Sequence, residues 1–369
     1  MEPVKIGIVG CGNISSSYLN TANAFPILEA AACCDIDASR AEARAEEFGV
    51  GRACSMADLL ADPEIQIVVN LTTPQSHMEV SLAAIEAGKH VYTEKPLAVT
   101  VEEGRRILEA AEKKGVRVGC APGTFLAAGL QTCRKMIDEG VIGRPVACSA
   151  FMMSHGHESW HPDPAYYYQV GAGPMFDMGP YYLTALTTLL GPIAQVAGTA
   201  GILIGERTIT SKPKYGEKIT VRTPDHVTGT MRFASGAIGT IITTFATWPS
   251  QLPRIEIYGT EATLAVPDPN TLAGPVRLCK AGTREWEDIE LTHPHSQRKD
   301  MWGLGVVDLA YAIRSGRPHR ATGKQGYHVL ELMQSFLDSS AKKEYIAIES
   351  TMERPAPVPT GLDMYELDK

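Results

Sequence analysis

The stretch VKIGIVGCGNIS, residues 4–15, runs from a continuous apolar segment into a glycine-rich turn. Val4–Val9 predicts a strand buried on both faces, and Asn13–Ala24 predicts the helix that follows the turn. Gly10 permits a tight turn, and Gly12 allows a ligand to approach the backbone amides at the positive end of the helix. A strand, a Gly-x-Gly turn and a helix in this order are typical of a dinucleotide-binding unit.

An acidic residue follows the second predicted strand, Glu29–Cys34, where such a unit needs one. The Asp35 carboxylate can accept hydrogen bonds from both ribose hydroxyls of NAD and would repel the 2′-phosphate of NADP. Arg40 could instead bind that phosphate, so NAD is favoured and NADP is left open. The residues expected to hold the nucleotide are Gly10, Gly12, Asn13, Ile14, Asp35 and Arg40.

The first 120 residues continue to alternate apolar strands with helices. Further strands are predicted at Ile65–Leu71, His90–Tyr92 and Val116–Cys120, and the helices between them end at glycines. Fully apolar strands joined by helices indicate a parallel sheet that is covered on both faces. We therefore predict a doubly wound parallel sheet in residues 1–122, forming an NAD(P)-binding Rossmann domain.

The pattern changes after residue 122. Runs such as Val227–Phe233 and Ala237–Thr247 alternate apolar and polar positions, which is typical of antiparallel strands with one solvated face. Helices are expected before and after these strands. We predict that residues 123–369 form an α+β domain.

Composition and charge exclude several classes of protein. Hydrophobic residues make up 44% of the chain and charged residues 21%, which is ordinary for a globular protein. A net charge of −8 without a cluster of Lys and Arg argues against nucleic acid as a partner. No apolar run approaches the roughly 20 residues that cross a bilayer, and no leader precedes the first strand, so we expect no membrane partner and a cytoplasmic location. The eight cysteines have no framework spacing, which favours free thiols.

Two further strand ends carry chemically active side chains. Thr72, Thr73 and Pro74 lie at the edge where doubly wound sheets bind ligands, so we expect them to touch the cofactor. His77 could join them, or it could simply cap the next helix or pack on it. The tripeptide Glu94-Lys95-Pro96 follows the fourth strand and is also expected at the cofactor. A lysine beside a cationic nicotinamide would have a reduced pKa and could take part in proton transfer.

A third motif, Gly171–Tyr182, leads into an apolar helix. Because proline is tolerated only in the first helical turn, Pro180 predicts that this helix begins near Phe176 or Asp177. Asp177 and Tyr181 then lie four residues apart on one face, where a carboxylate beside a phenol could relay a proton. In isolation, the alternative is an aspartate N-cap and a core aromatic residue.

Together, Gly10-x-Gly12, Glu94-Lys95-Pro96 and Asp177-x-Gly179-x-Tyr181 make the chain resemble the Gfo/Idh/MocA family of oxidoreductases. The resemblance implies NAD(P)-linked oxidation of sugars, inositols and related polyols, with Lys95 before a cis proline and beside the nicotinamide. It also implies a large open, mainly antiparallel sheet in the second domain, through which homodimers or homotetramers form. Many members have histidine at the position of Tyr181. Tyrosine there resembles the glucose–fructose oxidoreductase and dimeric dihydrodiol dehydrogenase branches, where it serves as acid/base.

A loop rich in histidine and aromatic residues, 155–169, is expected to complete the substrate pocket. Its side chains offer hydrogen bonds and aromatic faces that suit a carbohydrate. The residues expected to bind substrate are His155, Trp160, His161 and Tyr168, together with Lys95, Asp177 and Tyr181. His155 and His157 lack a third ligand at zinc spacing, so no metal is expected.

The resulting hypothesis is a dehydrogenase that oxidises a hydroxyl of a sugar, inositol or related polyol or glycoside by hydride transfer to NAD(P). Tyr181 would take the hydroxyl proton, Lys95 would lower the pKa of the tyrosine and orient the hydroxyl, and Asp177 would bind a second hydroxyl. Two alternatives stay open. One is a glycosidase or lyase that retains NAD and oxidises its substrate transiently, and the other is an inactive, ligand-sensing protein of the same fold.

Overall fold

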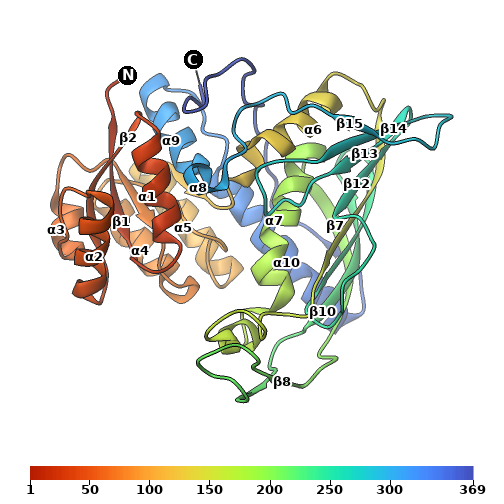
Figure 1. Ribbon diagram of the computed structural model, residues 1–369, viewed down its shortest axis with the longest axis horizontal. Coiled ribbons are helices and arrows are strands. Elements are labelled where there is room, and N and C mark those ends of the chain that lie inside the picture. The colour runs from red at the N-terminus through yellow and green to blue at the C-terminus, as the bar shows by residue number, and fades with distance from the viewer. Residues whose placement is uncertain (369) are drawn as a thin grey trace.

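The computed structural model describes residues 1–368, and its N-terminal part is built on a five-stranded parallel sheet (Figure 1). The strand order β2-β1-β3-β4-β5 reverses direction at β1, so the carboxyl ends of β1 and β3 border the crevice where doubly wound sheets bind ligands. Because crossovers between parallel strands are right-handed, the reversal places α1 on one face and α4 and α5 on the other. This confirms the predicted Rossmann sheet. Its elements are β1 (Val4–Val9), α1 (Ser15–Ala24), β2 (Leu28–Cys34), α2 (Ala38–Phe48), α3 (Met56–Ala61), β3 (Ile67–Asn70), α4 (Pro74–Glu86), β4 (His90–Thr93), α5 (Val101–Lys114) and β5 (Val118–Cys120).

Local sequence signals set the ends of these helices. Thr100 starts α5 with a capping box, in which its hydroxyl accepts the Glu103 amide and the Glu103 carboxylate accepts the Thr100 amide. Gly49 and Gly115 end α2 and α5 in the left-handed conformation, each with φ of 68°. The first domain is therefore strongly specified by local sequence.

The second sheet has nine strands in the order β15-β14-β13-β12-β6-β11-β10-β7-β16. Its pairs are antiparallel except for β6 and β11, which run parallel at the centre. Helices α6, α7 and α10 pack on one face, and Figure 1 shows the other face without a helix. This confirms a large, mainly antiparallel sheet with helices. The elements are α6 (Ala128–Asp138), β6 (Pro145–Met153), α7 (Gly173–Leu190), β7 (Ile193–Gly201), β10 (His226–Phe233), β11 (Ile238–Thr244), β12 (Ile255–Gly259), β13 (Ala262–Val266), β14 (Val276–Lys280), β15 (Glu287–Ile289), α10 (Gly323–Lys342) and β16 (Ile346–Ala347).

Two small pieces extend from this frame. The hairpin of β8 (Glu206–Thr208) and β9 (Lys218–Thr220) lies at the bottom of Figure 1, beside the 3₁₀ turn η2 (Pro164–Tyr168). Another 3₁₀ turn, η1 (Thr124–Leu126), joins β5 to α6. The hairpin buries an arginine, Arg207, against the loop that carries η2.

The chain returns to the first sheet after the second is complete. Helix α8 (Arg298–Met301) packs on α1, and α9 (Leu304–Ser315) packs on β5. The Gly303 amide donates to the Thr21 hydroxyl at 3.0 Å, and Thr322 bridges to Gly119. The Rossmann sheet ends with β5 at Cys120 and the second sheet begins with β6 at Pro145, whereas two later helices lie on the Rossmann side; the division at residue 122 stays a prediction.

One predicted boundary is wrong. Helix α7 begins at Gly173, not near Phe176 or Asp177, and Pro180 lies inside the helix. Pro174, rather than Pro180, occupies the first turn, where a missing N–H costs nothing. The apolar helix of 18 residues buries nearly all of its length, and tertiary packing of this kind outweighs the local preference of one proline.

No helix in residues 1–368 is long and apolar enough to cross a membrane.

Candidate active site

The Gly-x-Gly turn leaves an open hollow at the N-terminus of α1. Gly10 has a φ of 98°, and a Cβ there would lie 2.8 Å from the Leu71 backbone. A Cβ on Gly12 would meet nothing within 4 Å, so the space in front of the helix is free. No side chain caps the first amides of α1. This cradle fits the pyrophosphate of a dinucleotide, which helix N-termini bind through free backbone amides. The hollow is lined by Cys11, Gly12, Asn13, Arg40, Ala43 and Arg44.

Asp35 lies beside this hollow at the end of β2. Its carboxylate accepts the Cys11 amide at 2.7 Å and the Asp37 amide at 2.9 Å, which fixes its orientation. Ile36 is fully exposed next to it, an apolar surface at the position where a dinucleotide would place its adenosine half. Arg40 is exposed, with its Nε 3.4 Å from an Asp37 carboxylate oxygen. The predicted nucleotide residues are therefore gathered around one hollow.

The loop after β3 is tied to the loop after β4 by His77. The buried imidazole lies with Nδ1 2.7 Å from the Pro96 carbonyl and Nε2 3.1 Å from the Thr72 carbonyl. Burial lowers the pKa of His77. Because both ring nitrogens face the backbone, His77 holds the two loops together, which agrees with the packing alternative. Of the predicted loop residues, Pro74 reaches the pocket described next.

A pocket of about 150 Å³ lies where the two sheets meet. Lys95 and Pro96, joined by a cis peptide, line it from the Rossmann side, and Asp177 lines it from α7. Glu94 does not line it. Its carboxylate accepts the Tyr18 hydroxyl at 2.7 Å and the Lys95 amide at 2.9 Å, so it braces the lysine loop. The remaining wall consists of Pro74, Tyr166, Tyr167, Gly171, Ala172 and Phe176.

Lys95 and Asp177 form a buried ion pair. The Lys95 ammonium donates to Oδ1 of Asp177 at 2.8 Å and to its main-chain carbonyl at 2.6 Å. Burial alone would lower the pKa of Lys95, but the neighbouring carboxylate raises it above its usual range. Here the charge of the carboxylate outweighs burial, and the reduced pKa expected beside a cationic nicotinamide stays a prediction. Burial would likewise raise the pKa of Asp177, yet Lys95 and His157 hold it below its usual range.

Pro180 changes the hydrogen bonding of the helix one turn before it. Proline has no N–H to donate to the Phe176 carbonyl, so the helix ladder is interrupted at the turn that carries Asp177. The Asp177 carbonyl accepts the lysine ammonium in this turn. Both the carboxylate and the main-chain carbonyl of Asp177 face Lys95, one residue after the carbonyl that the proline leaves without its helical donor.

Tyr181 follows Asp177 by four residues, as predicted, and both lie near Lys95. The ammonium is 5.3 Å from the centroid of the Tyr181 ring. The ring is 6.2 Å from that of Trp302 and is only 7% exposed. Lys95, from the loop after β4, is thus brought together with Asp177 and Tyr181, from helix α7.

The structure does not place the four predicted residues of the 155–169 loop in the pocket wall. His155 stacks on Trp248, with ring centroids 3.7 Å apart, and Trp160 is 62% exposed. His161 accepts the Asp163 amide at 3.0 Å. Tyr168 is fully buried, and its hydroxyl donates to Glu158 at 2.6 Å. They lie outside the pocket wall because the opposite side of this loop, which carries Tyr166 and Tyr167, faces the pocket.

Three other histidine and tyrosine residues that the sequence offers in this loop, though not among the four expected to bind substrate, do reach the site. Tyr166 and Tyr167 line the pocket, and His157 reaches Asp177, with Nε2 3.3 Å from Oδ2. The available signal was Gly156, whose φ is 90° and whose missing Cβ makes room for the Tyr168 hydroxyl. A glycine between two histidines reverses the chain and sends their side chains to different sides.

Comparisons with known proteins agree with this geometry. Residues 4–121 match the oxidoreductase family with an NAD-binding Rossmann fold, and residues 130–265 match the GFO/IDH/MocA C-terminal domain. A 1,5-anhydro-D-fructose reductase of Ensifer adhaerens is 30% identical over 70% of this chain and 74% of its own length. A D-glucoside 3-dehydrogenase of Escherichia coli is 31% identical over 66% of this chain and 71% of its own length.

A solved structure shares the whole fold. Levoglucosan dehydrogenase in complex with NADH and levoglucosan superposes with a TM-score of 0.80 at 22% identity, covering 94% of this chain and 100% of that one. Its identity is low, so it supports the fold alone. The family matches and the more identical relatives go further: this chain belongs to the Gfo/Idh/MocA family of oxidoreductases.

Proposed function

We propose that this protein is an NAD(P)-dependent dehydrogenase that oxidises a hydroxyl group of an uncharged sugar, inositol or related polyol or glycoside. The observation that supports this proposal most directly is the Lys95–Asp177 pair, which lies in the pocket between the nucleotide-binding sheet and α7. An ammonium, a carboxylate and a nearby phenol are the groups that removal of a hydroxyl proton requires. The relatives named above act, by their names, on carbohydrates.

The wall of the pocket favours a neutral substrate. Tyr166, Tyr167 and Phe176 supply aromatic faces on which the C–H side of a sugar ring can pack. Lys95 and Asp177 neutralise each other, so neither charge is left for a carboxylate or phosphate of the substrate.

NAD is the favoured cofactor. Its nicotinamide ring, when bound, accepts the hydride. The amides of the Gly10–Ile14 turn would hold the pyrophosphate, and the oriented Asp35 carboxylate would accept the ribose hydroxyls. Arg40 and Arg44 line the same hollow, and they are the groups that would hold a 2′-phosphate if NADP is used instead.

The chain's own residues divide the proton chemistry. Lys95 stays protonated because of Asp177, so it orients the substrate hydroxyl and acts through its charge. We assign the hydroxyl proton to Tyr181, the phenol whose ring centroid lies 5.3 Å from the Lys95 ammonium. Asp177 fixes Lys95 and can accept a second substrate hydroxyl. The tyrosine at this position groups the chain with the tyrosine-bearing branches of the family.

The test is a panel of aldoses, inositols and glycosides incubated with NAD or NADP, followed by NADH absorbance and product analysis. We expect NADH to form in equal amount to an oxidised product. Loss of a glycoside without net NADH would favour the NAD-retaining glycosidase or lyase, and binding without turnover would favour the sensor. Either result would overturn the dehydrogenase.

Lys95→Met should lower kcat by about 10²- to 10⁴-fold and leave the Kd for NADH nearly unchanged, because the ammonium acts on the hydroxyl and not on the nucleotide. The exposed Lys113 on α5 offers a control in Lys113→Met, which should keep wild-type kinetics. Full turnover by Lys95→Met would contradict the assigned role.

We also propose that the helix-free face of the nine-stranded sheet joins two copies of the chain into a homodimer, or more into a tetramer. Ile238, on the central strand β11, is 50% exposed, while Gly239 and Ile241 are buried in the same strand. Size-exclusion chromatography with light scattering should give a dimer or tetramer for the wild type and a smaller species for Ile238→Lys. A monomeric wild type would contradict this assembly.

A further inference from the structure

The Asp177 carboxylate has two partners: Lys95 comes from the Rossmann domain, and the second comes from a loop of the domain that contains Asp177. Lys95 occupies Oδ1 at 2.8 Å, while Nε2 of His157 lies 3.3 Å from Oδ2. Asp177 is thus held from both sides, and its two oxygens have different neighbours. In the tyrosine-bearing motif the fourth residue after the aspartate is not histidine, yet an imidazole still reaches this carboxylate.

The His157 side chain is enclosed by aromatic rings. It is 10% exposed and stacks on Tyr167 with centroids 3.8 Å apart and an interplanar angle of 5°. Phe245 meets the same ring edge-on at 4.8 Å. Its Nδ1 is buried without a hydrogen-bond partner among the described residues. Since Nε2 is the nitrogen that faces a charged group, the imidazole is oriented toward Asp177.

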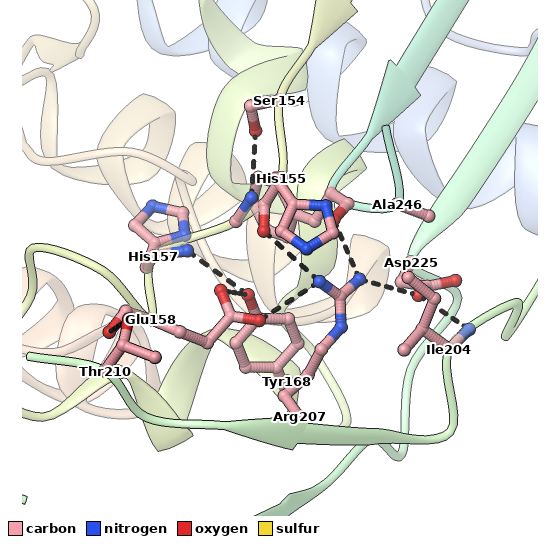
Figure 2. A network of polar contacts seen from close by, with 12 residues as sticks. Ser154, His155, His157, Glu158, Tyr168, Ile204, Arg207, Thr210, Asp225 and Ala246 are labelled. Carbon is pink, nitrogen blue, oxygen red and sulfur yellow. Dashed lines mark hydrogen bonds and ion pairs between the residues drawn. The ribbon is translucent and has the colours of Figure 1, made fainter. Parts of the chain in front are cut away.

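A buried ionic cluster fixes the backbone on both sides of His157 (Figure 2). One guanidinium nitrogen of Arg207, on β8, donates to the His155 carbonyl at 3.2 Å and to Glu158 at 3.0 Å. The other donates to Asp225 at 3.0 Å and to the Phe245 carbonyl at 2.8 Å. All three charged side chains are nearly fully buried, so the cluster holds a single geometry.

The cluster reaches His157 itself through one hydroxyl. Tyr168 accepts the His157 amide at 3.2 Å and donates to Glu158 at 2.6 Å (Figure 2). Buried ion pairs contribute little net stability compared with apolar packing, and their best-attested use is to fix one arrangement. Here the arrangement that they fix is the turn from which His157 extends.

We propose that His157 is a positioning residue of the active site: its Nε2–H orients the Asp177 carboxylate toward Lys95, and the Arg207 cluster exists to present it. This inference rests on the proposed dehydrogenase function. Without His157, Oδ2 loses its fixed partner and the carboxylate can rotate away from the ammonium. The hydrogen bond is the essential element, and the stacking on Tyr167 is secondary.

Two substitutions separate the hydrogen bond from the packing. His157→Gln retains an N–H that can reach Asp177 but loses the ring that stacks on Tyr167. His157→Phe retains an aromatic ring but has no donor. We expect His157→Phe to lower kcat by about 10- to 100-fold, since small displacements of a reacting group have effects of this size, and His157→Gln to recover most of it.

The opposite order, with His157→Phe active and His157→Gln impaired, would assign the residue to packing and overturn the proposal. NADH binding and the unfolding midpoint establish that each variant is folded. As a matched control, His226→Gln changes a half-buried histidine of β10 that bonds the Thr244 hydroxyl, and it should keep wild-type kcat. Tyr168→Phe should lower kcat in the same direction as His157→Phe. An unchanged kcat in Tyr168→Phe would show that the Arg207 cluster does not influence the active site.

A readout without turnover distinguishes failure of this inference from failure of the proposed function. Lys95 can be labelled with trinitrobenzenesulfonate, and its peptide quantified by mass spectrometry. A loosened Asp177 leaves more of the amine unprotonated, so His157→Phe should label severalfold faster than wild type, and His157→Gln close to wild type. Equal rates in all three would overturn the positioning role, even if no substrate has been found.

Discussion

Lys95 forms a buried ion pair that favours its charged form. Its ammonium bonds two oxygens of Asp177, a residue 82 positions further along the chain. This carboxylate raises the lysine pKa above its usual range, although burial by itself would lower it. The protonation of Lys95 is therefore governed by the carboxylate beside it more than by the burial of the lysine.

Gly12→Ala tests whether the free space before α1 is cofactor space. No atom lies within 4 Å of the added methyl group, so the free energy of unfolding should change by less than about 0.5 kcal/mol. The same methyl group would occupy the space of the pyrophosphate, so the Kd for NADH should rise by about tenfold or more. Urea unfolding and NADH fluorescence titration measure the two effects.

Gly10→Ala provides the contrast. Its φ of 98° and the Leu71 backbone at 2.8 Å make any side chain costly, so unfolding free energy should fall by more than about 2 kcal/mol. If Gly12→Ala instead destabilised the fold and bound NADH normally, the hollow would not be the nucleotide site.

Different parts of helix α7 serve the stability of the fold and the candidate active site. Its last three turns are buried and apolar, whereas its first turns contain Asp177 and end at Pro180. The proline removes a hydrogen bond to the Phe176 carbonyl and crowds the preceding turn. The Phe176 carbonyl, which a regular helix would pair with the N–H of residue 180, directly precedes Asp177, the residue that bonds Lys95.

Pro180→Ala should therefore separate activity from stability. Alanine restores the N–H and favours a regular helix, so the free energy of unfolding should stay level or rise, by up to about 3 kcal/mol. The Phe176 carbonyl would then accept the restored N–H, the turn that carries Asp177 would straighten away from Lys95, and kcat should fall by about tenfold. Thermal unfolding and steady-state kinetics measure both. A variant that loses stability and keeps its kcat would show that the proline serves packing.

On the scale of the whole molecule, the two sheets are locked together by the last third of the chain. Helices α8 and α9 return to the Rossmann side, and α10 touches both β5 and β7. The C-terminal tail is fastened by His293, whose Nε2 lies 3.0 Å from the Val358 carbonyl, and by His328, whose Nδ1 lies 2.8 Å from the Ser350 hydroxyl. This locking fixes the distance between Lys95 and α7.

His328 makes this architecture sensitive to acid. Its Nε2 accepts the Ile193 amide at 3.1 Å, so the folded protein needs a neutral ring, and burial lowers the pKa to about 4 from 6.5. The unfolded chain therefore binds the proton first as the pH falls. The stabilisation is complete above about pH 6.5 and is lost between there and about pH 4, reaching a loss of about 2 kcal/mol at pH 5.

Urea unfolding of His328→Gln at pH 7 and pH 5 measures this contribution. The variant should lose about 2 kcal/mol less than the wild type over this interval, because glutamine does not titrate there. An unchanged pH dependence in His328→Gln would mean that other groups cause the acid sensitivity.

The sequence by itself determined the first domain and the order of its functional motifs. Val4–Val9, the glycines at 10 and 12 and the capping residues act through local backbone preferences, which operate within a few residues and can be recognised without a structure. The spacing of Asp177 and Tyr181 is likewise a local property of a helix. These features predicted the Rossmann sheet and three residues that the structure brings together.

Only the tertiary structure decided what those residues touch. The Lys95–Asp177 pair joins two sheets, His157 reaches the same carboxylate from a loop, and Tyr168 turns inward to Glu158. Such contacts depend on how whole elements pack, and no periodicity in the sequence encodes them. For the same reason burial of α7 overrode the helix start predicted from Pro180, because packing along a whole helix outweighs the preference of one residue.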